Sequence, residues 1–141
     1  MSVVKHFLDT NVFVYTFDLQ DARKSKQAEN LIADALRTGL GVISYQVAQE
    51  FVAVARKQFK TAMNDHQIER YWHATLKPLL AVNSSPGLFN RALDLVRRDQ
   101  LSWYDSLIVA AAIQADCKIL YSEDMQHGRR FGDLVIQNPF L

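Results

Sequence analysis

Four acidic residues of this sequence stand where short apolar runs meet helical patterns. Asp9 follows the first apolar run directly, and Asp124 follows a later one. Glu50 lies near the start of a helical segment, and Asp105 stands at the head of another. Carboxylates that gather together repel one another, and a hard divalent ion such as Mg²⁺ or Mn²⁺ relieves that repulsion through oxygen ligands. Because such ions activate water for phosphodiester cleavage, the acids predict a metal-loaded, phosphate-directed site if the fold unites them.

The elements that must position these acids alternate along the chain. Short apolar runs, typical of strands covered on both faces, occupy residues 3–8, 41–44, 79–82, 118–121 and 134–136. Helical spacing occupies residues 22–38, 45–59, 65–77, 86–98 and 103–115. This alternation predicts an α/β fold, a parallel sheet with helices on both faces. Ligands bind at the carboxyl ends of the strands in such sheets, and all four acids fall on that side.

The helical segment 103–115 differs from the others. Residues 107–113 are seven consecutive apolar residues, three of them alanine, which predicts a helix buried on all sides. Asp105 heads this helix, and an ionised carboxylate there needs a partner because a buried unpaired charge is costly. A metal ion is one such partner.

Taken singly, each acid also has an ordinary structural interpretation. Asp9 can cap the short helix that follows it, and Ser102 with Asp105 fits a capping-box pattern. Glu50 lies at the edge of an apolar stripe, and Asp124 can be a solvated loop acid. It is their common edge of the sheet that favours a shared site.

Length and composition describe one ordinary folded domain spanning residues 1–141. There is no repeat, low-complexity segment or linker, and 49% of the residues are hydrophobic. The net charge of +1 gives no general nucleic-acid signal, so such contacts would depend on local arrangement. The single cysteine, Cys117, excludes an internal disulfide and favours a reducing cytoplasm. We also expect neither a signal peptide nor a membrane span, because the apolar runs are too short.

The sequence resembles a known family in four of its motifs. The strand followed by Asp9-Thr10-Asn11-Val12, the helical Glu50, residues 103–108 before an alanine-rich helix, and residues 122–124 resemble the four motifs of PIN domains. The order and spacing of these motifs cover residues 4–136. A PIN domain this short, without appended modules, looks most like the VapC toxins of bacterial toxin–antitoxin pairs.

The resemblance implies an α/β/α sandwich with a parallel sheet of about five strands. It also implies a Mg²⁺- or Mn²⁺-dependent endoribonuclease that forms a homodimer and is inhibited by an antitoxin protein. By position, Asp9 and Asp105 would be the principal metal ligands, with Asp124 as a further ligand and Glu50 completing the catalytic acids. Asn11 and Ser122 match polar positions that support the pocket.

Residues outside the four motifs have less specific interpretations. Arg129 and Arg130, beside His127, are either solvated loop charges or contacts for RNA phosphates next to the metal. The aromatic residues Trp72, Trp103 and Tyr104 fit the core or a dimer contact better than a platform for stacking bases.

Three other functions compete with the nuclease. A haloacid-dehalogenase-type phosphatase begins with Asp-x-Asp, whereas this chain has Asn11 at the second acidic position. A phospho-receiver domain needs an acidic pair at the end of its first strand. Neither rival explains Glu50 together with Asp105. A catalytically silent PIN-like domain that binds RNA or protein stays open, and metal-dependent cleavage is the observation that separates it.

Overall fold

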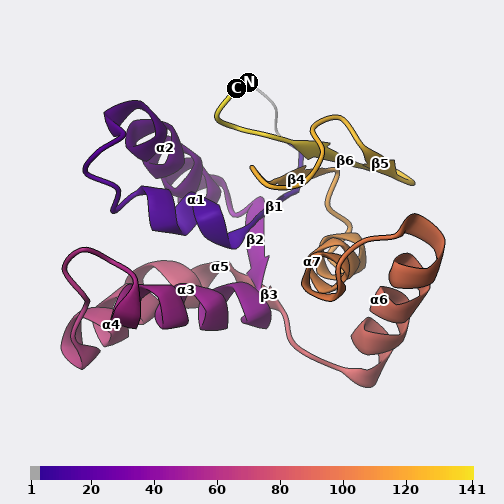
Figure 1. Ribbon diagram of the computed structural model, residues 1–141, viewed down its shortest axis with the longest axis horizontal. Helices are drawn as coiled ribbons and strands as arrows, with labels where there is room; N and C mark the ends of the chain where they lie inside the picture. Colours follow the sequence, from indigo (N-terminus) through magenta and orange to yellow (C-terminus); the bar gives the residue numbers. More distant parts are fainter. Residues whose placement is uncertain (1–3) are drawn as a thin grey trace.

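One sheet runs through the centre of the molecule and carries the candidate site at one of its edges. The computed structural model describes residues 4–141 and is drawn in Figure 1. In this part of the chain six strands lie in the order β3-β2-β1-β4-β6-β5. Their bounds are His6–Leu8 (β1), Gly41–Ser44 (β2), Leu80–Val82 (β3), Ile119–Tyr121 (β4), Arg130–Phe131 (β5) and Leu134–Gln137 (β6). All neighbouring strands are parallel except β5 and β6, so the predicted parallel sheet is confirmed.

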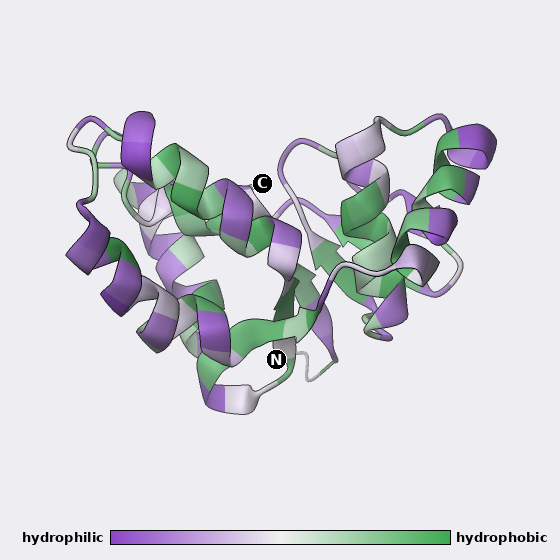
Figure 2. Ribbon diagram, turned by 90° about the horizontal axis from the view of Figure 1, so that it is seen from below, coloured by the Kyte–Doolittle hydropathy of each residue, from purple (hydrophilic) through white to green (hydrophobic). Residues whose placement is uncertain are grey.

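Helices cover both faces of the sheet in a single-domain α/β/α arrangement. Figure 1 shows α1 and α2 on one side, with α6 and α7 on the other. The helices are Thr10–Tyr15 (α1), Ala22–Thr38 (α2), Tyr45–Lys57 (α3), Asp65–Tyr71 (α4), Lys77–Leu79 (α5), Pro86–Asp99 (α6) and Trp103–Gln114 (α7). In Figure 2 the central strands are hydrophobic, whereas the surrounding helices alternate between hydrophobic and hydrophilic residues. The longer amphipathic helices α2, α3 and α6 therefore bury one stripe each.

The first strand is central, because β1 lies between β2 and β4. Phe7 and Leu8 are fully buried, which explains their unbroken apolar character. The strand begins at His6, later than the sequence predicts. Val3, the predicted first residue, lies outside the described residues.

Two parts of the fold differ from the sequence-based expectation. The strand β5 was not predicted, since two residues are too short to show a period; it returns through Gly132, whose φ is +61°, to pair with β6. The single helix predicted over 65–77 is instead interrupted by a π-helical turn, Trp72–Leu76, before α5. Pro78 lies in the first turn of α5. Its ring would clash with the carbonyl four residues earlier in a regular α-helix, which explains the wider turn.

The predicted buried helix is α7. Five consecutive residues from Ile108 to Ala112 are 3% exposed or less, so this part of the helix is enclosed on all sides as its composition predicts. No helix of the described residues 4–141 is long and apolar enough to cross a membrane.

Candidate active site

The four acids predicted from the sequence line one cleft at the carboxyl end of the central strands. The cleft has a volume of about 340 Å³ and lies between α1, α3, α7 and the loop after β4. We call it the acidic cleft; its polar lining residues are Asp9, Thr10, Asn11, Gln46, Glu50, Tyr104, Asp105 and Asp124. The topology brings these residues together, because β1 and β4 are parallel neighbours whose carboxyl ends meet at one edge.

Asp9 is the most constrained of the four acids. One carboxylate oxygen accepts a 2.7 Å hydrogen bond from the backbone N–H of Thr10, so Asp9 does cap α1. The other oxygen accepts a 2.9 Å hydrogen bond from the hydroxyl of Ser122. Burial raises the pKa of Asp9 to about 6; the charges of Glu50 and Asp105 add to this effect, while the two hydrogen bonds oppose it. The cap and a functional role are therefore compatible in the same side chain.

Glu50 reaches the acidic cleft from α3. The hydroxyl of Thr10 donates a 2.6 Å hydrogen bond to its Oε1. The side-chain amide of Gln46 donates to its Oε2 at 3.3 Å and to the backbone carbonyl of Tyr104 at 3.4 Å. These contacts turn Glu50 toward the cleft, and they link α3 to α1 and α7.

Asp105 enters the cleft from the first turn of α7. Ser102 caps this helix by accepting a 3.2 Å hydrogen bond from the backbone N–H of Asp105. No reciprocal bond from Ser102 to the Asp105 carboxylate occurs among the hydrogen bonds of the described chain, so the full capping box is not formed. The carboxylate is left to face the cleft.

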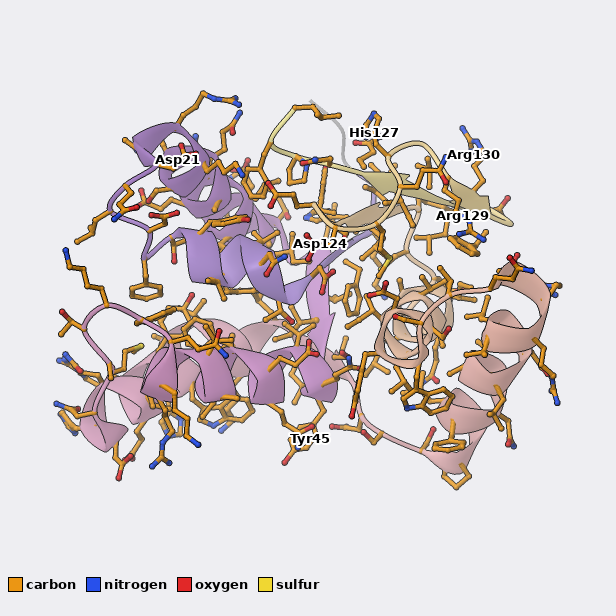
Figure 3. The ribbon with its side chains drawn as sticks, viewed as in Figure 1. Asp21, Tyr45, Asp124, His127, Arg129 and Arg130 are labelled. Carbon is orange, nitrogen blue, oxygen red and sulfur yellow. The ribbon has the colours of Figure 1, made fainter. Side chains whose placement is uncertain are left out.

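Asp124 lies on the loop after β4, where Figure 3 shows it near α1. Its Oδ2 accepts a 2.7 Å hydrogen bond from the side-chain amide of Asn11. The two predicted supporting residues thus contact different acids: Asn11 holds Asp124, and Ser122 holds Asp9.

Sequence reasoning missed Thr10 and Gln46. Both contact Glu50, and both line the acidic cleft. The spacing of Gln46 and Glu50, four residues apart in a helical segment, is the signal that points to their contact. For Thr10 the sequence has no comparable signal, because its partner lies in a different helix.

The basic residues after Asp124 do not line the acidic cleft. Arg129 donates a 2.7 Å hydrogen bond to the carbonyl of Asp99 at the end of α6, and its guanidinium lies over the ring of Phe131. Arg130 is exposed on β5. Figure 3 shows both arginines beside the outer strand β5, away from Asp124. Of the two, Arg130 is the one left free to approach a phosphate.

The three aromatic residues weighed above differ in their surroundings. Trp72 and Trp103 are half-buried, and Trp103 packs against Phe89 with ring centroids 4.7 Å apart. Tyr104 is 64% exposed at the rim of the acidic cleft. The core alternative therefore fits the tryptophans and not Tyr104, for which the dimer contact stays a prediction.

The chemistry of the lining residues fits a hard divalent cation. All four acids supply oxygen, which Mg²⁺ and Mn²⁺ prefer, and a nearby cation would favour the ionised form of Asp9. Within residues 4–141 no group of three or more His, Cys, Asp or Glu side chains is arranged so that it could hold a metal ion. Mg²⁺ takes one or two protein carboxylates and completes its coordination with water, so a pair of these acids is enough for such an ion.

Comparisons with known proteins identify the family and the fold. The PIN domain family model matches residues 6–130. No curated protein matches the chain at the level of sequence. Among solved structures, a toxin–antitoxin complex from Klebsiella pneumoniae aligns with a TM-score of 0.68 and 20% identity, over 96% of this chain and 98% of that chain.

Two further structures show the same fold. VapBC2 from Rickettsia felis, bound to a DNA fragment from its promoter, aligns with a TM-score of 0.64 and 18% identity over 94% of this chain and 97% of that chain. The Mycobacterium tuberculosis VapC20, a toxin that cleaves the sarcin–ricin loop, aligns with a TM-score of 0.63 and 19% identity over 85% and 90%. With its motifs, its topology and the family model in agreement, the chain belongs to the PIN domain family.

Proposed function

We propose that this protein is a Mg²⁺- or Mn²⁺-dependent endoribonuclease and the toxin of a toxin–antitoxin pair. The observation that carries the proposal is the convergence of Asp9, Glu50, Asp105 and Asp124 on one cleft. The family supports a nuclease, and the structural resemblance to toxins, one of which cleaves the sarcin–ricin loop, supports RNA as the substrate.

We assign each acid a role from its position in the cleft. Asp9 and Asp105 would hold the cation, Asp124 would bind it directly or through water, and Glu50 would complete the acidic pocket. When bound, the ion activates water and stabilises the leaving oxygen of the phosphodiester. Ser122 and the Thr10 N–H fix the orientation of Asp9, which keeps its oxygens directed at the site.

Binding of the RNA away from the scissile bond requires cations outside the acidic cleft, because the carboxylates of the cleft repel every phosphate that the metal does not contact. Arg130 is the candidate phosphate contact, since it is exposed and Arg129 is already engaged by Asp99. We expect the loss of a phosphate contact to weaken binding similarly for all RNAs.

The decisive experiment measures cleavage of RNA by the purified protein with Mg²⁺ or Mn²⁺. We expect EDTA, Asp9→Asn and Asp105→Asn each to abolish cleavage. Asp133→Asn is the matched control, because Asp133 is 89% exposed and pairs only with Lys118 across 3.6 Å in the described structure. Full cleavage by Asp9→Asn or Asp105→Asn would contradict the assigned site, and binding of RNA without any metal-dependent cleavage would identify a silent domain.

The toxin role has a separate test. Expression of the protein alone should arrest bacterial growth, whereas expression of Asp9→Asn should not. Co-expression of a cognate antitoxin protein should restore growth. We also expect a homodimer, measured by sedimentation of the purified chain. Cleavage of RNA without growth arrest would leave a nuclease with a different cellular role.

A further inference from the structure

We propose that Glu123 is a positioning residue that holds the Asp124 loop at the acidic cleft through a network with Tyr15 and Lys24. The proposal rests on the metal site proposed above, because it assigns a task to side chains that support one of its ligands. None of these three residues lines the acidic cleft.

Glu123 is held by two helices at once. The hydroxyl of Tyr15, at the end of α1, donates a hydrogen bond to Oε1 of Glu123. The ammonium of Lys24, in the first turn of α2, donates to Oε2 at 2.6 Å. The side chains of Lys24 and Glu123 are only 28% and 20% exposed. In every other ion pair of the described chain, at least one of the two side chains is more exposed than Lys24. A charge-assisted hydrogen bond of this kind is shorter and stronger than one between neutral groups.

Lys24 is itself fixed in place. Asp21 caps α2 by accepting a 3.0 Å hydrogen bond from the backbone N–H of Lys24, and Figure 3 shows Asp21 at that end of the helix. The Lys24 ammonium lies 4.8 Å from the centroid of the Tyr15 ring and 5.7 Å from that of Phe140. These two rings meet edge to face at 5.1 Å. Tyr15, Lys24 and Phe140 therefore pack together around the carboxylate of Glu123, and we call these three residues the socket.

The socket matters for the site because of the order of residues after β4. Three consecutive side chains make three different contacts: Ser122 with Asp9, Glu123 with the socket, and Asp124 with Asn11. Asp124 is exposed, and the Asn11 amide is the one described hydrogen-bond partner of its carboxylate. Ser122 on one side and the buried Met125 on the other also hold the loop. Without the Glu123 anchor, the Asn11 amide would be the one described side-chain contact that directs the Asp124 carboxylate.

The first measurement needs no metal. Amide hydrogen exchange over residues 122–129, where the N–H groups of Ser122, Gly128 and Arg129 are hydrogen-bonded, should accelerate in Tyr15→Phe and Lys24→Met, measured in the full chain with EDTA present. The matched control is Lys26→Met, which removes a charge from the same helix. Lys26 is 72% exposed, and its ammonium lies 4.0 Å from the Glu29 carboxylate, so this ion pair is long and solvated. Exchange over residues 122–129 that is unchanged in both Tyr15→Phe and Lys24→Met would overturn the proposal.

The second measurement is the affinity for Mn²⁺ alone, by titration calorimetry. Lys24→Met removes a positive charge near the site, so electrostatics alone would tighten Mn²⁺ binding. Loss of positioning has the opposite effect, and we expect binding to weaken about tenfold, the lower end for residues that support metal ligands. Tyr15→Phe changes no charge and should weaken binding as well. Lys24→Arg, which keeps the charged donor, should restore most of the affinity.

The outcomes distinguish this proposal from the function on which it rests. Wild-type protein that binds no Mn²⁺ and cleaves no RNA contradicts the proposed function, and the exchange rates then decide the anchoring alone. Wild-type binding with equal or tighter binding by Tyr15→Phe and Lys24→Met contradicts the positioning role and leaves the nuclease intact.

Discussion

The hydroxyl of Thr10 donates a 2.6 Å hydrogen bond to Oε1 of Glu50, which lies 40 positions further along the chain. Thr10 is 8% exposed and is the residue whose backbone N–H also binds Asp9. One residue thus orients two acids of the cleft, Asp9 through its backbone and Glu50 through its side chain.

The Thr10 hydroxyl can be removed without changing the shape of the residue. We expect Thr10→Val to reduce RNA cleavage by up to about 100-fold, because a misplacement of a catalytic group by about 1 Å can cost that much. The Mn²⁺ affinity should change less, because Glu50 is not among the three proposed ligands. Thr10→Ser keeps the hydroxyl and should stay within a few-fold of wild type. Equal activity of Thr10→Val and Thr10→Ser would show that the hydroxyl does not matter.

The raised pKa of Asp9 makes the metal-free protein sensitive to pH. Because burial raises this pKa from 3.8 to about 6, the unfolded chain releases the Asp9 proton at lower pH than the folded chain. The Asp9 contribution to stability is therefore greatest below about pH 4 and declines until about pH 6, by about 3 kcal/mol for this group. Asparagine has no charge to bury. At pH 7 the free energy of unfolding of Asp9→Asn should therefore exceed that of wild type by up to that amount.

The measurement is urea unfolding of both proteins with EDTA at pH 4 and pH 7. The difference in unfolding free energy should change between the two values of pH, with Asp9→Asn favoured at the higher. Added Mg²⁺ at pH 7 should stabilise wild type and not the variant. A difference that does not depend on pH would contradict the raised pKa.

Most of the fold could be predicted because its signals are local. Apolar runs and helical periods locate five strands and the longer helices, and alternation alone specifies a parallel sheet. The two-residue strand β5 and the π-helical turn before Pro78 escape, because each depends on how a few residues meet their surroundings. Neither one lines the acidic cleft.

The site divides in the same way. The acids could be identified because the carboxyl ends of parallel strands share an edge, a consequence of topology. Their partners could not, since contacts such as Thr10 with Glu50 join separate elements whose register only the fold determines. Glu123 looks like an ordinary loop acid in the sequence, and only the positions of Tyr15 and Lys24 indicate a task for it.

The single cysteine should be inert in the folded protein. Cys117 is 4% exposed, and burial raises the pKa of its thiol to about 11, so little thiolate exists at pH 8. We expect a thiol-specific disulfide reagent to label the native protein very slowly and the protein in guanidinium chloride at once. Rapid labelling of the native protein would show that the segment around Cys117 opens readily.

The contact between α2 and β2 depends on the absence of a side chain at Gly41. A Cβ at this position would lie 2.2 Å from Cβ and 3.0 Å from Cα of Ala35, and 2.8 Å from Nε2 of His6. Since the first two atoms belong to a packed helix, Gly41→Ala must push α2 away from β2, and we expect a loss of about 1–3 kcal/mol or more in unfolding free energy.

Gly87→Ala is the control, because the nearest atom to its Cβ would be Oγ of Ser85 at 4.0 Å. In the helix α6 that change should be neutral or stabilise by about 0.5–1 kcal/mol. Urea unfolding of the three proteins at one pH decides the matter, and equal midpoints for Gly41→Ala and wild type would contradict the close packing of α2 on β2.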